Sequence, residues 1–299
     1  VEIAVPLSQL RFNGGLGDTT WGLNVCRIII RKQEETYWVP FPREWQSLGF
    51  ARMSGAGVLT GLKDLKPRRR MELVPYTAPS VVRDYDAGTP TKYHKDFGFD
   101  AKVGLTQSIN ADLTYKTDFA QVEADQEVVN TSRFSLFFPE KRQFFTESAG
   151  IFDYSMNSGS QTGPGLLTLF YSRRIGLQDG REVPLFGGAR ITGNYRGLSL
   201  GLMSVQTEGE EISGTLPSNF SVARVKKNIF NRSTIGGFLL SKEMGGTNDY
   251  NRVIGTDVNF TLFRYLQILG TFAKTSSPVS GLRTEGNDWL SDFSVFWEE

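Results

Sequence analysis

The chain has 299 residues, enough for one large domain or two ordinary ones. Its 33 Lys and Arg nearly balance its 32 Asp and Glu, and the net charge of +1 argues against nucleic-acid binding through bulk charge. The longest apolar runs, such as Ile28 to Ile30, are far shorter than the roughly 20 residues of a membrane-spanning helix, so transmembrane helices are excluded. One Cys and one His rule out a disulfide framework and nearly all Cys/His metal sites, and we expect no metal and no cofactor.

The N-terminal region reads as short β-strands. Val1 to Leu7 alternates between apolar and polar residues, and Trp21 to Arg31 predicts one strand or a strand pair. The basic cluster from Lys66 to Arg70 marks a change of composition. We therefore predict a first domain at residues 1–64 and a second at 65–299. The 22 Phe and 32 Gly also favour a β-rich architecture.

Beyond residue 70 the dominant signal has a period of two. From Phe97 to Leu105 and from Ile109 to Tyr115, the odd positions are apolar and the even ones mostly polar, including Asp100, Lys102 and Asp112. Because successive side chains of a strand point to opposite faces, this pattern predicts one apolar and one polar face. The pattern returns from Ile254 to Leu262. Weaker versions occupy 186–206, 220–230, 233–242, 265–275 and 289–297.

Two architectures fit this alternation. Strands of roughly 10 residues with alternating polarity are typical of a transmembrane β-barrel, and a soluble β-sandwich or lipocalin-like barrel gives a similar pattern. Strand length and aromatic residues near strand ends favour the membrane, because aromatic side chains form girdles at the two interfaces. The candidate girdle residues are Tyr93, Phe97, Tyr115, Phe119, Phe260, Phe263, Tyr265 and Phe272.

Several motifs together resemble a known family. They are Asp118 to Gln126, Asn130 to Phe134, Phe137 to Glu147 with Gly150 to Phe152, Leu169 to Gly176, and Gly187 to Gly193. In this order they resemble the uncharacterised bacterial outer-membrane β-barrels that carry an N-terminal family-9-type carbohydrate-binding domain. The resemblance covers nearly the whole chain, and the run from Asp118 to Phe152 is its most specific part.

The resemblance implies an all-β fold in two parts. Residues 1–64 are similar to the last strands of the carbohydrate-binding β-sandwich, and residues 65–299 to part of an antiparallel transmembrane β-barrel with an inward or plug-like loop near 118–150. Family members are longer at both ends, so we expect an internal fragment. Its open sheet edges would need further strands or another chain, because hydrocarbon does not tolerate unpaired edges.

The segment from Gln121 to Glu147 is rich in charge, and two interpretations are open. It could be an inward plug whose carboxylates face a polar lumen, and a cation or sugar could bind there. It could also be a salt-bridged structural loop at the barrel mouth, which is the interpretation we favour. A catalytic pair of carboxylates cannot be assigned from sequence spacing. The residues that would shape the electrostatics are Glu123, Asp125, Arg133, Glu140, Arg142 and Glu147.

Two further groups are candidate sites. Arg173 and Arg174 follow Tyr171 at a predicted strand end, where only one of them could face a lumen; structural pairing with a plug carboxylate is the favoured role. Trp38 and Trp45 could present flat rings to sugars, with packing inside a β-sandwich as the alternative.

The sequence thus predicts an outer-membrane β-barrel protein of a Gram-negative bacterium, with its N-terminal part outside the bilayer and a role in glycan-associated binding or transport. The alternatives are a hydrolase acting on O-glycosyl bonds and a soluble all-β binding protein. The expected partners are outer-membrane lipid, with glycan or oligosaccharide and other outer-membrane proteins as further candidates, and no nucleic acid.

Overall fold

The computed structural model describes residues 2–7, 10, 12, 18–41, 50, 55–65, 71–82, 91–106, 108–116, 140–152, 169–178, 181–209, 216–230, 233–263, 266–278 and 288–297. The chain divides into two compact units, residues 1–68 and 69–299, each with its own internal contacts. The division falls close to the composition change at the basic cluster.

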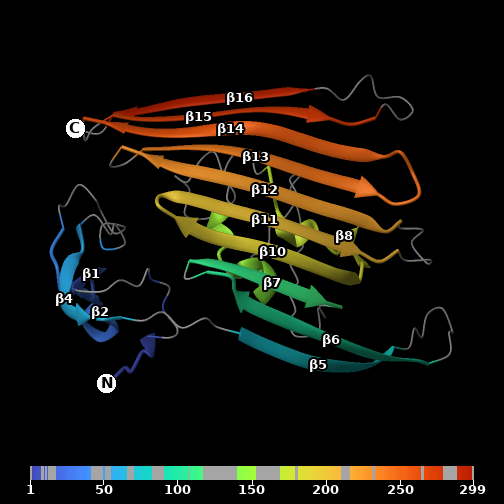
Figure 1. The fold of residues 1–299 in the computed structure, drawn as a ribbon, viewed down its shortest axis with the longest axis horizontal. Helices are drawn as coiled ribbons and strands as arrows, with labels where there is room; N and C mark the ends of the chain where they lie inside the picture. Colours follow the sequence, from blue (N-terminus) through green and yellow to red (C-terminus); the bar gives the residue numbers. More distant parts are fainter. Residues whose placement is uncertain are drawn as a thin grey trace. The chain divides into compact units, whose positions relative to one another are not determined.

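The second unit is built on one ten-stranded antiparallel sheet (Figure 1). Its order, β16-β15-β14-β13-β12-β11-β10-β7-β6-β5, follows the chain except where β7 pairs with β10. Strands β5 and β16 are its edges, and the described residues form no closed barrel. The strands are β5 (Met71–Val82), β6 (Lys92–Gly104), β7 (Ile109–Tyr115), β10 (Leu185–Tyr195), β11 (Leu198–Thr207), β12 (Ser218–Ile229), β13 (Ser233–Met244), β14 (Tyr250–Leu262), β15 (Leu266–Ser276) and β16 (Trp289–Trp297).

The alternation in the sequence locates these strands well. The fold is mostly β, as predicted, and every alternating segment beyond residue 90 corresponds to one strand or to a hairpin of two. The segment 186–206 is such a hairpin, because Arg196 and Gly197 form a tight turn with positive φ at both residues. Left-handed φ angles at both turn positions match the twist of a two-residue hairpin.

The sheet has two distinct faces. We define the inner face as the one that contacts residues 140–152, and the outer face as the opposite one. On β11, Gly201, Met203 and Val205 are buried on the inner face, while Leu202 and Ser204 between them are exposed. The same period of two continues across the sheet, because each antiparallel register pairs inner residues with inner residues, as in Met203 with Val222.

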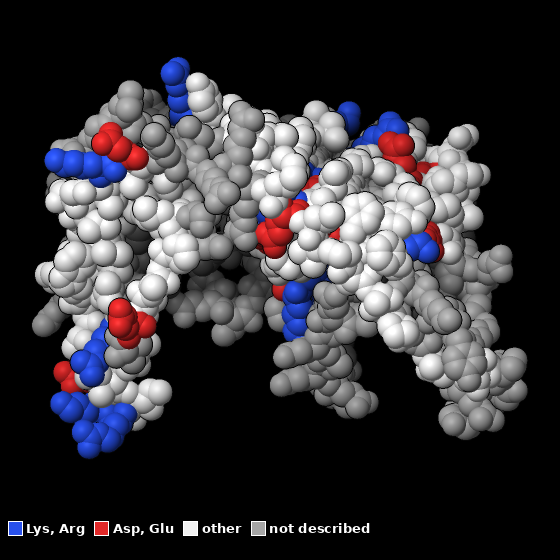
Figure 2. All heavy atoms as spheres, turned by 60° about the horizontal axis from the view of Figure 1, so that its bottom comes forward, with Lys and Arg blue, Asp and Glu red and all other residues white. Residues whose placement is uncertain are grey.

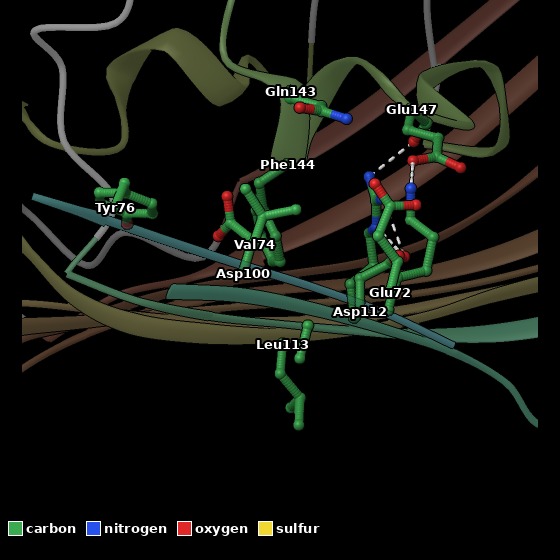
Figure 3. A pocket seen from close by; sticks show the side chains of 12 residues that line it. Glu72, Val74, Tyr76, Asp100, Asp112, Leu113, Gln143, Phe144 and Glu147 are labelled. Carbon is green, nitrogen blue, oxygen red and sulfur yellow. Dashed lines mark hydrogen bonds and ion pairs between the residues drawn. The ribbon is translucent and has the colours of Figure 1, made fainter. Parts of the chain in front are cut away.

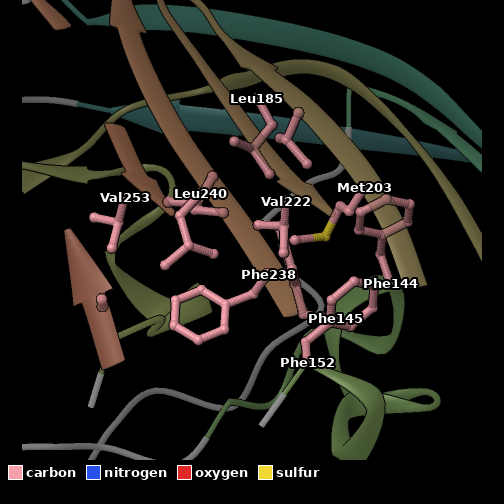
Figure 4. Packing of buried hydrophobic residues seen from close by; sticks show 12 residues of the cluster. Phe144, Phe145, Phe152, Leu185, Met203, Val222, Phe238, Leu240 and Val253 are labelled. Atoms are coloured by element: carbon pink, nitrogen blue, oxygen red, sulfur yellow. The ribbon is translucent and has the colours of Figure 1, made fainter. Parts of the chain in front are cut away.

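A hydrophobic core fills part of the inner face (Figure 4). Its sheet members include Met203, Val222 and Phe238, and three phenylalanines from the connection between β7 and β10 pack against them. These are Phe144, Phe145 and Phe152, all at most 7% exposed. Residues 140–152 of this connection therefore fold back onto the sheet, and the inward or plug-like loop near 118–150 stays a prediction.

Short elements fix this inward segment, which we define as the described residues 140–152 and 169–178. It contains α1 (Gln143–Thr146) and two 3-10 helices, η6 (Ala149–Ile151) and η7 (Ser172–Arg174). The small strands β8 (Leu177–Gln178) and β9 (Arg181–Glu182) pair with each other before β10 begins. Residues 121–139 of the charged segment from Gln121 to Glu147 lie outside the described residues.

The first unit contains four short strands. β1 (Asp18–Leu23) pairs with β4 (Gly57–Lys63), and β2 (Cys26–Ile29) pairs with β3 (Glu34–Tyr37). The expected strand at Val1 to Leu7 is wrong: residues 2–6 have no strand conformation, since alternation without a pairing partner does not make a strand. The assignment of this unit to a carbohydrate-binding β-sandwich stays a prediction.

Gly201 provides a test of how the inward segment packs. A β-carbon added there would lie 2.7 Å from Cγ2 of Ile151 and 2.8 Å from Cε1 of Phe152. We expect Gly201→Val to lower the free energy of unfolding by about 1–3 kcal/mol, the usual cost of overpacking. Gly237→Val is the matched control, because the nearest atom to its added β-carbon is a backbone oxygen at 3.8 Å. Urea unfolding monitored by near-UV circular dichroism compares the two; equal losses would contradict this packing.

Candidate functional site

Arg142 organises the inward segment. Its Nε and Nη2 atoms donate to the two carboxylate oxygens of Glu140 at 2.8 and 2.7 Å, and its guanidinium also donates to the carbonyl oxygens of Ile175 and Ser172 at 2.7 and 2.8 Å. The Ser172 hydroxyl donates to Glu140 at 2.7 Å. Arg142 is only 2% exposed and lies against the ring of Phe145. One buried cation thus joins α1 to η7.

Glu140 is held in its charged form by this arrangement. Burial by itself would raise the pKa of the Glu140 carboxyl. The hydrogen bonds and positive charge of Arg142, with the Ser172 hydroxyl, outweigh burial and lower the pKa of Glu140 below its ordinary value. The group therefore stabilises the fold above the pKa it has in the unfolded chain, and that stability is lost as pH falls through the folded value.

Arg190 joins the inward segment to the sheet. On β10 it faces Asp112 of β7, and its Nε and Nη2 atoms donate to Asp112 Oδ2 at 3.1 and 2.9 Å. Its Nη1 atom donates to the backbone carbonyl of Glu147 at 2.6 Å. The Glu147 side chain forms an ion pair with Lys102 of β6. Glu147 is therefore fixed twice, once through its backbone and once through its carboxylate.

A second buried arginine lies farther along the inner face. Arg224 of β12 is 1% exposed, and it pairs with Asp257 of β14, with 2.7 Å between Nη2 and Oδ2. The pair spans the intervening strand β13 at Gly236, where an added β-carbon would lie 2.6 Å from both Arg224 Nη1 and Asp257 Oδ1. A glycine at this position is what lets the two charges meet.

An open pocket lies between the inward segment and the sheet (Figure 3). In Figure 3, Gln143 and Glu147 approach it from the inward segment, and Leu113 points away through the sheet. The Thr114 hydroxyl donates to Asp100 at 2.5 Å beside it. The residues that line it include four carboxylates and two cations: Glu72, Asp100, Asp112 and Glu147, with Lys102 and Arg190.

The structure brings together part of the predicted charged set. Glu140, Arg142 and Glu147 all lie in the inward segment, each in an ion pair. Arg173 and Arg174 lie in the 3-10 helix η7, so their expected place at a strand end is wrong: the chain turns there because Ile175 N donates to the carbonyl of Ser172. Glu123, Asp125, Arg133 and Trp45 are outside the described residues.

Trp38 occupies an exposed position in the first unit. It follows β3, its backbone N–H donates to the carbonyl of Val25 at 2.9 Å, and 58% of the residue is exposed. A ring held by its backbone and open to solvent is compatible with sugar stacking.

The alternating pattern places Asp100, Lys102 and Asp112 on a polar face but does not identify Arg190 as the partner of Asp112. Arg190 was visible only within the motif Gly187 to Gly193, and the pairing of Arg224 with Asp257 had no local signal, because the partners are distant in sequence. The available signal was that Arg190, Arg224 and Asp257 each occupy an inner-face position of an alternating strand. Charged residues are uncommon at such buried positions.

The fold and site define an all-β protein whose open antiparallel sheet carries buried ion pairs and an inward-folded segment on one face. Residues 67–187 match a protein family described as a domain of unknown function (DUF5916). This range contains the Asp118 to Phe152 motifs, so the resemblance is confirmed at the level of an uncharacterised domain family. Its carbohydrate-binding and outer-membrane parts stay predictions. No curated protein and no solved structure matches the chain.

Among the described residues, no helix is long and apolar enough to cross a membrane. The same residues contain no group of three or more His, Cys, Asp or Glu side chains able to hold a metal ion.

Glu140→Gln tests the Arg142 cluster. Removing the charge leaves a buried arginine without its carboxylate partner, and we expect the free energy of unfolding to fall by about 3–5 kcal/mol at pH 7. Glu243→Gln is the control, because the pair of Glu243 with Arg252 is solvent-exposed and should contribute little to stability. The difference between wild type and Glu140→Gln should shrink as pH falls below the unfolded pKa, as measured by urea titrations across the acid range. A difference independent of pH would rule out Glu140 ionisation as the cause.

Proposed function

We propose that residues 69–299 form part of the wall of an outer-membrane β-barrel, with lipid on the outer face and a polar, partly plugged passage on the inner face. The observation that carries this proposal is the outer face itself. Its central positions are apolar and solvent-exposed, and the described residues provide nothing that covers them. They include Leu73, Leu113, Leu202, Val225, Ile235, Leu239, Ile254, Phe293 and Val295, all between 39 and 69% exposed.

This distribution is the reverse of that in a water-soluble sheet. Leu239, Ala223 and Ile254 lie side by side on β13, β12 and β14 and form part of a continuous apolar outer surface. On the opposite face, the neighbouring positions hold Arg224, which is buried, in an ion pair with the partly buried Asp257. Exposed apolar area spread over many strands indicates contact with an apolar phase or a partner. Among the described residues in Figure 2, the charged ones gather in a few places with uncharged residues between them.

Strand length and aromatic placement support lipid as the apolar phase. From β10 to β16 the strands have 9 to 13 residues, close to the roughly 9–11 that a tilted strand needs to cross a bilayer. Exposed aromatic residues lie at both ends of the sheet, as in the two interfacial girdles of membrane barrels. They are Tyr195, Phe230, Phe263 and Trp297 at one end, and Phe97, Phe186, Phe272 and Trp289 at the other.

The inner face favours passage or binding over catalysis. Four carboxylates of this face, Glu140, Glu147, Asp112 and Asp257, each pair with an arginine or a lysine, which is the arrangement of a structural lining. Glycan association is proposed on the exposed ring of Trp38. A hydrolase of O-glycosyl bonds remains the alternative, and the cavity beside Asp100 and Asp112 is where its carboxylates would lie.

Leu239→Arg separates a membrane wall from a soluble sheet. Leu239 lies midway along β13 and is 45% exposed. In a bilayer, arginine at this depth should destabilise the protein folded into phospholipid vesicles by about 2–4 kcal/mol. In a soluble protein, an exposed leucine replaced by arginine should change stability by no more than about 0.5 kcal/mol. Asn248→Arg, in the exposed turn between β13 and β14, is the control and should cost little in either case.

The lengths of the connections between strands also support an orientation of the proposed barrel in the membrane. At one end of the sheet they are short, covering residues 105–108, 196–197, 230–232 and 263–265. At the other end they are longer, covering 83–91, 116–184, 208–217, 245–249 and 277–288. Outer-membrane barrels place short turns in the periplasm and long loops outside the cell. The inward segment would then enter the passage from the cell exterior.

Cysteine labelling tests this orientation. In a Cys26→Ser background, Asn248→Cys marks the long-loop end, and Leu105→Cys, 47% exposed, marks the short-turn end. In intact cells a membrane-impermeant maleimide should label Asn248→Cys, and it should label Leu105→Cys only after the outer membrane is permeabilised. The reverse pattern would overturn the orientation alone, whereas recovery of both variants in the soluble fraction would overturn the membrane proposal.

A further inference from the structure

Strand β5 is one edge of the ten-stranded sheet, and it contains two prolines (Figure 1). Pro75 and Pro79 are the only prolines within the described strands of this sheet. Proline has no backbone N–H, so within a sheet it is confined to edges, strand starts and bulges. The register of β5 with β6 nevertheless runs without a shift from Met71 to Val82. The effect of the prolines therefore depends on the side to which their backbone atoms point.

The alternation of backbone direction along a strand shows which side this is. Lys116 N, just after β7, donates to the carbonyl of Phe186 on β10 at 3.0 Å, so the backbone groups of Tyr115 point the other way, to β6. Tyr115 lies opposite Phe99 of β6, which therefore directs its own backbone groups to β7. Phe99 in turn lies opposite Pro75. The backbone of Pro75 consequently points away from β6, to the edge of the sheet.

The edge side of β5 thus has an interrupted row of donors. Pro79 is four residues from Pro75, so it faces the same side. The positions on this side are Met71, Leu73, Pro75, Thr77, Pro79 and Val81. Two of these six positions cannot donate a backbone hydrogen bond to a further strand.

The opposite edge of the sheet is different. Thr275 N of β15 donates to the carbonyl of Asp288 at 2.8 Å, so the backbone groups of the next residue, Trp289, point away from β15. By the same alternation, the edge side of β16 carries an N–H at every position, which are Trp289, Ser291, Phe293, Val295 and Trp297. The two edges therefore differ in how firmly they can pair with another strand.

Strand β5 also forms one side of the pocket between α1 and the sheet. Glu72, Val74 and Tyr76 of its inner face line this pocket (Figure 3). The lining combines charged side chains, such as that of Lys102, with apolar ones, such as that of Phe144. In the sheet order, no further described strand lies between this pocket and the edge.

The outer face of β5 is apolar. Met71, Leu73 and Val81 are all exposed and belong to the outer surface on which the proposed lipid contact rests. A molecule that passed the edge of β5 would therefore move between a lining of mixed polarity and an apolar phase. Such a path suits an amphiphile, which has a polar group joined to an apolar chain.

We propose that β5 forms a seam at which the barrel opens sideways, and that an amphiphilic molecule crosses there between the pocket and the lipid. The inference rests on the proposed membrane function, because hydrocarbon requires the edge side of β5 to pair with the strand that closes the barrel. That junction lacks the two backbone hydrogen bonds that Pro75 and Pro79 cannot donate. It therefore separates more readily than the junctions within the sheet. The polar group of the molecule lies in the pocket, and its apolar chain extends past β5 into the lipid.

Cysteine labelling from the lipid phase tests the seam in the full chain, folded into phospholipid vesicles. In a Cys26→Ser background, Val74→Cys places a thiol in the pocket, and the probe is a phospholipid that carries a maleimide on its acyl chain. We expect this probe to label Val74→Cys. Pro75→Ala combined with Pro79→Ala should slow that labelling by about tenfold, because two restored donors stabilise the closed seam. A water-soluble maleimide should label both proteins equally fast, since the pocket stays open on its inner side.

Two controls make the test specific. Lys226→Cys lies at a half-buried inner-face position of β12, in the middle of the sheet, and the lipid-borne maleimide should not label it. Pro217→Ala, just before β12, changes a proline outside the strands and should leave the labelling of Val74→Cys unchanged. The single variants Pro75→Ala and Pro79→Ala should each give an intermediate rate, and they replace the double variant if it fails to fold.

The outcomes separate the seam from the membrane assignment. Absence of lipid-phase labelling of Val74→Cys, an equal rate with and without the prolines, or equal labelling of Lys226→Cys would each overturn the seam alone, because Leu239→Arg tests the membrane wall separately. Prolines also protect the edges of soluble sheets from pairing with other chains. Recovery of the double proline variant as oligomers in buffer without detergent would indicate that role and overturn both proposals.

Discussion

The structure depends on Arg190, which holds a long chain connection against the sheet. A buried guanidinium has more donors than one carboxylate can accept, and this one divides them between Asp112 of the sheet and the Glu147 backbone of the inward segment. If either acceptor were absent, the site would contain an incompletely paired buried cation, which is strongly destabilising. The sheet and the inward segment therefore require each other. The cavity, the Phe144 contacts and the Lys102 ion pair all follow from that attachment.

The two faces of the sheet differ in the side chains that they carry. On the inner face, Arg190 and Arg224 are buried and paired with carboxylates, and phenylalanines of the inward segment pack against the buried apolar residues of the sheet. On the outer face, residues such as Leu239 and Ile254 are apolar although the described residues leave them uncovered. Burial of apolar side chains in a protein core explains neither the charged residues of the inner face nor the exposed apolar residues of the outer face. Under the proposed membrane assignment, an external apolar phase would account for the outer face. The cost of burying an unpaired charge accounts for the ion pairs of Arg190 and Arg224 on the inner face.

How far the sequence predicts the structure depends on the range of the interactions. The strands from Phe97 onward could be predicted because alternation is visible in the local sequence. Each of these strands also pairs with neighbouring strands, which stabilise its extended conformation. Val1 to Leu7 shows the same local pattern without a partner and is not a strand. Glu140 and Arg142 were identified because they are adjacent in a charged segment. The pair of Arg224 with Asp257 was missed because only the register of β12, β13 and β14 brings those residues together.

Gly236 shows how one missing side chain constrains a whole strand. Since Arg224 and Asp257 meet directly above it, β13 lies beneath a bridge that connects its two neighbours. Sliding β13 by two residues, the smallest shift that keeps its apolar face outward, would bring Thr234 or Phe238 under the bridge and force the charges apart. The ion pair therefore stabilises one register of β13 and destabilises the two registers shifted by two residues. In a sheet whose strands all alternate in polarity, registers shifted by two residues bury nearly the same apolar surface. The Arg224–Asp257 ion pair over Gly236 then distinguishes the native register from the shifted ones.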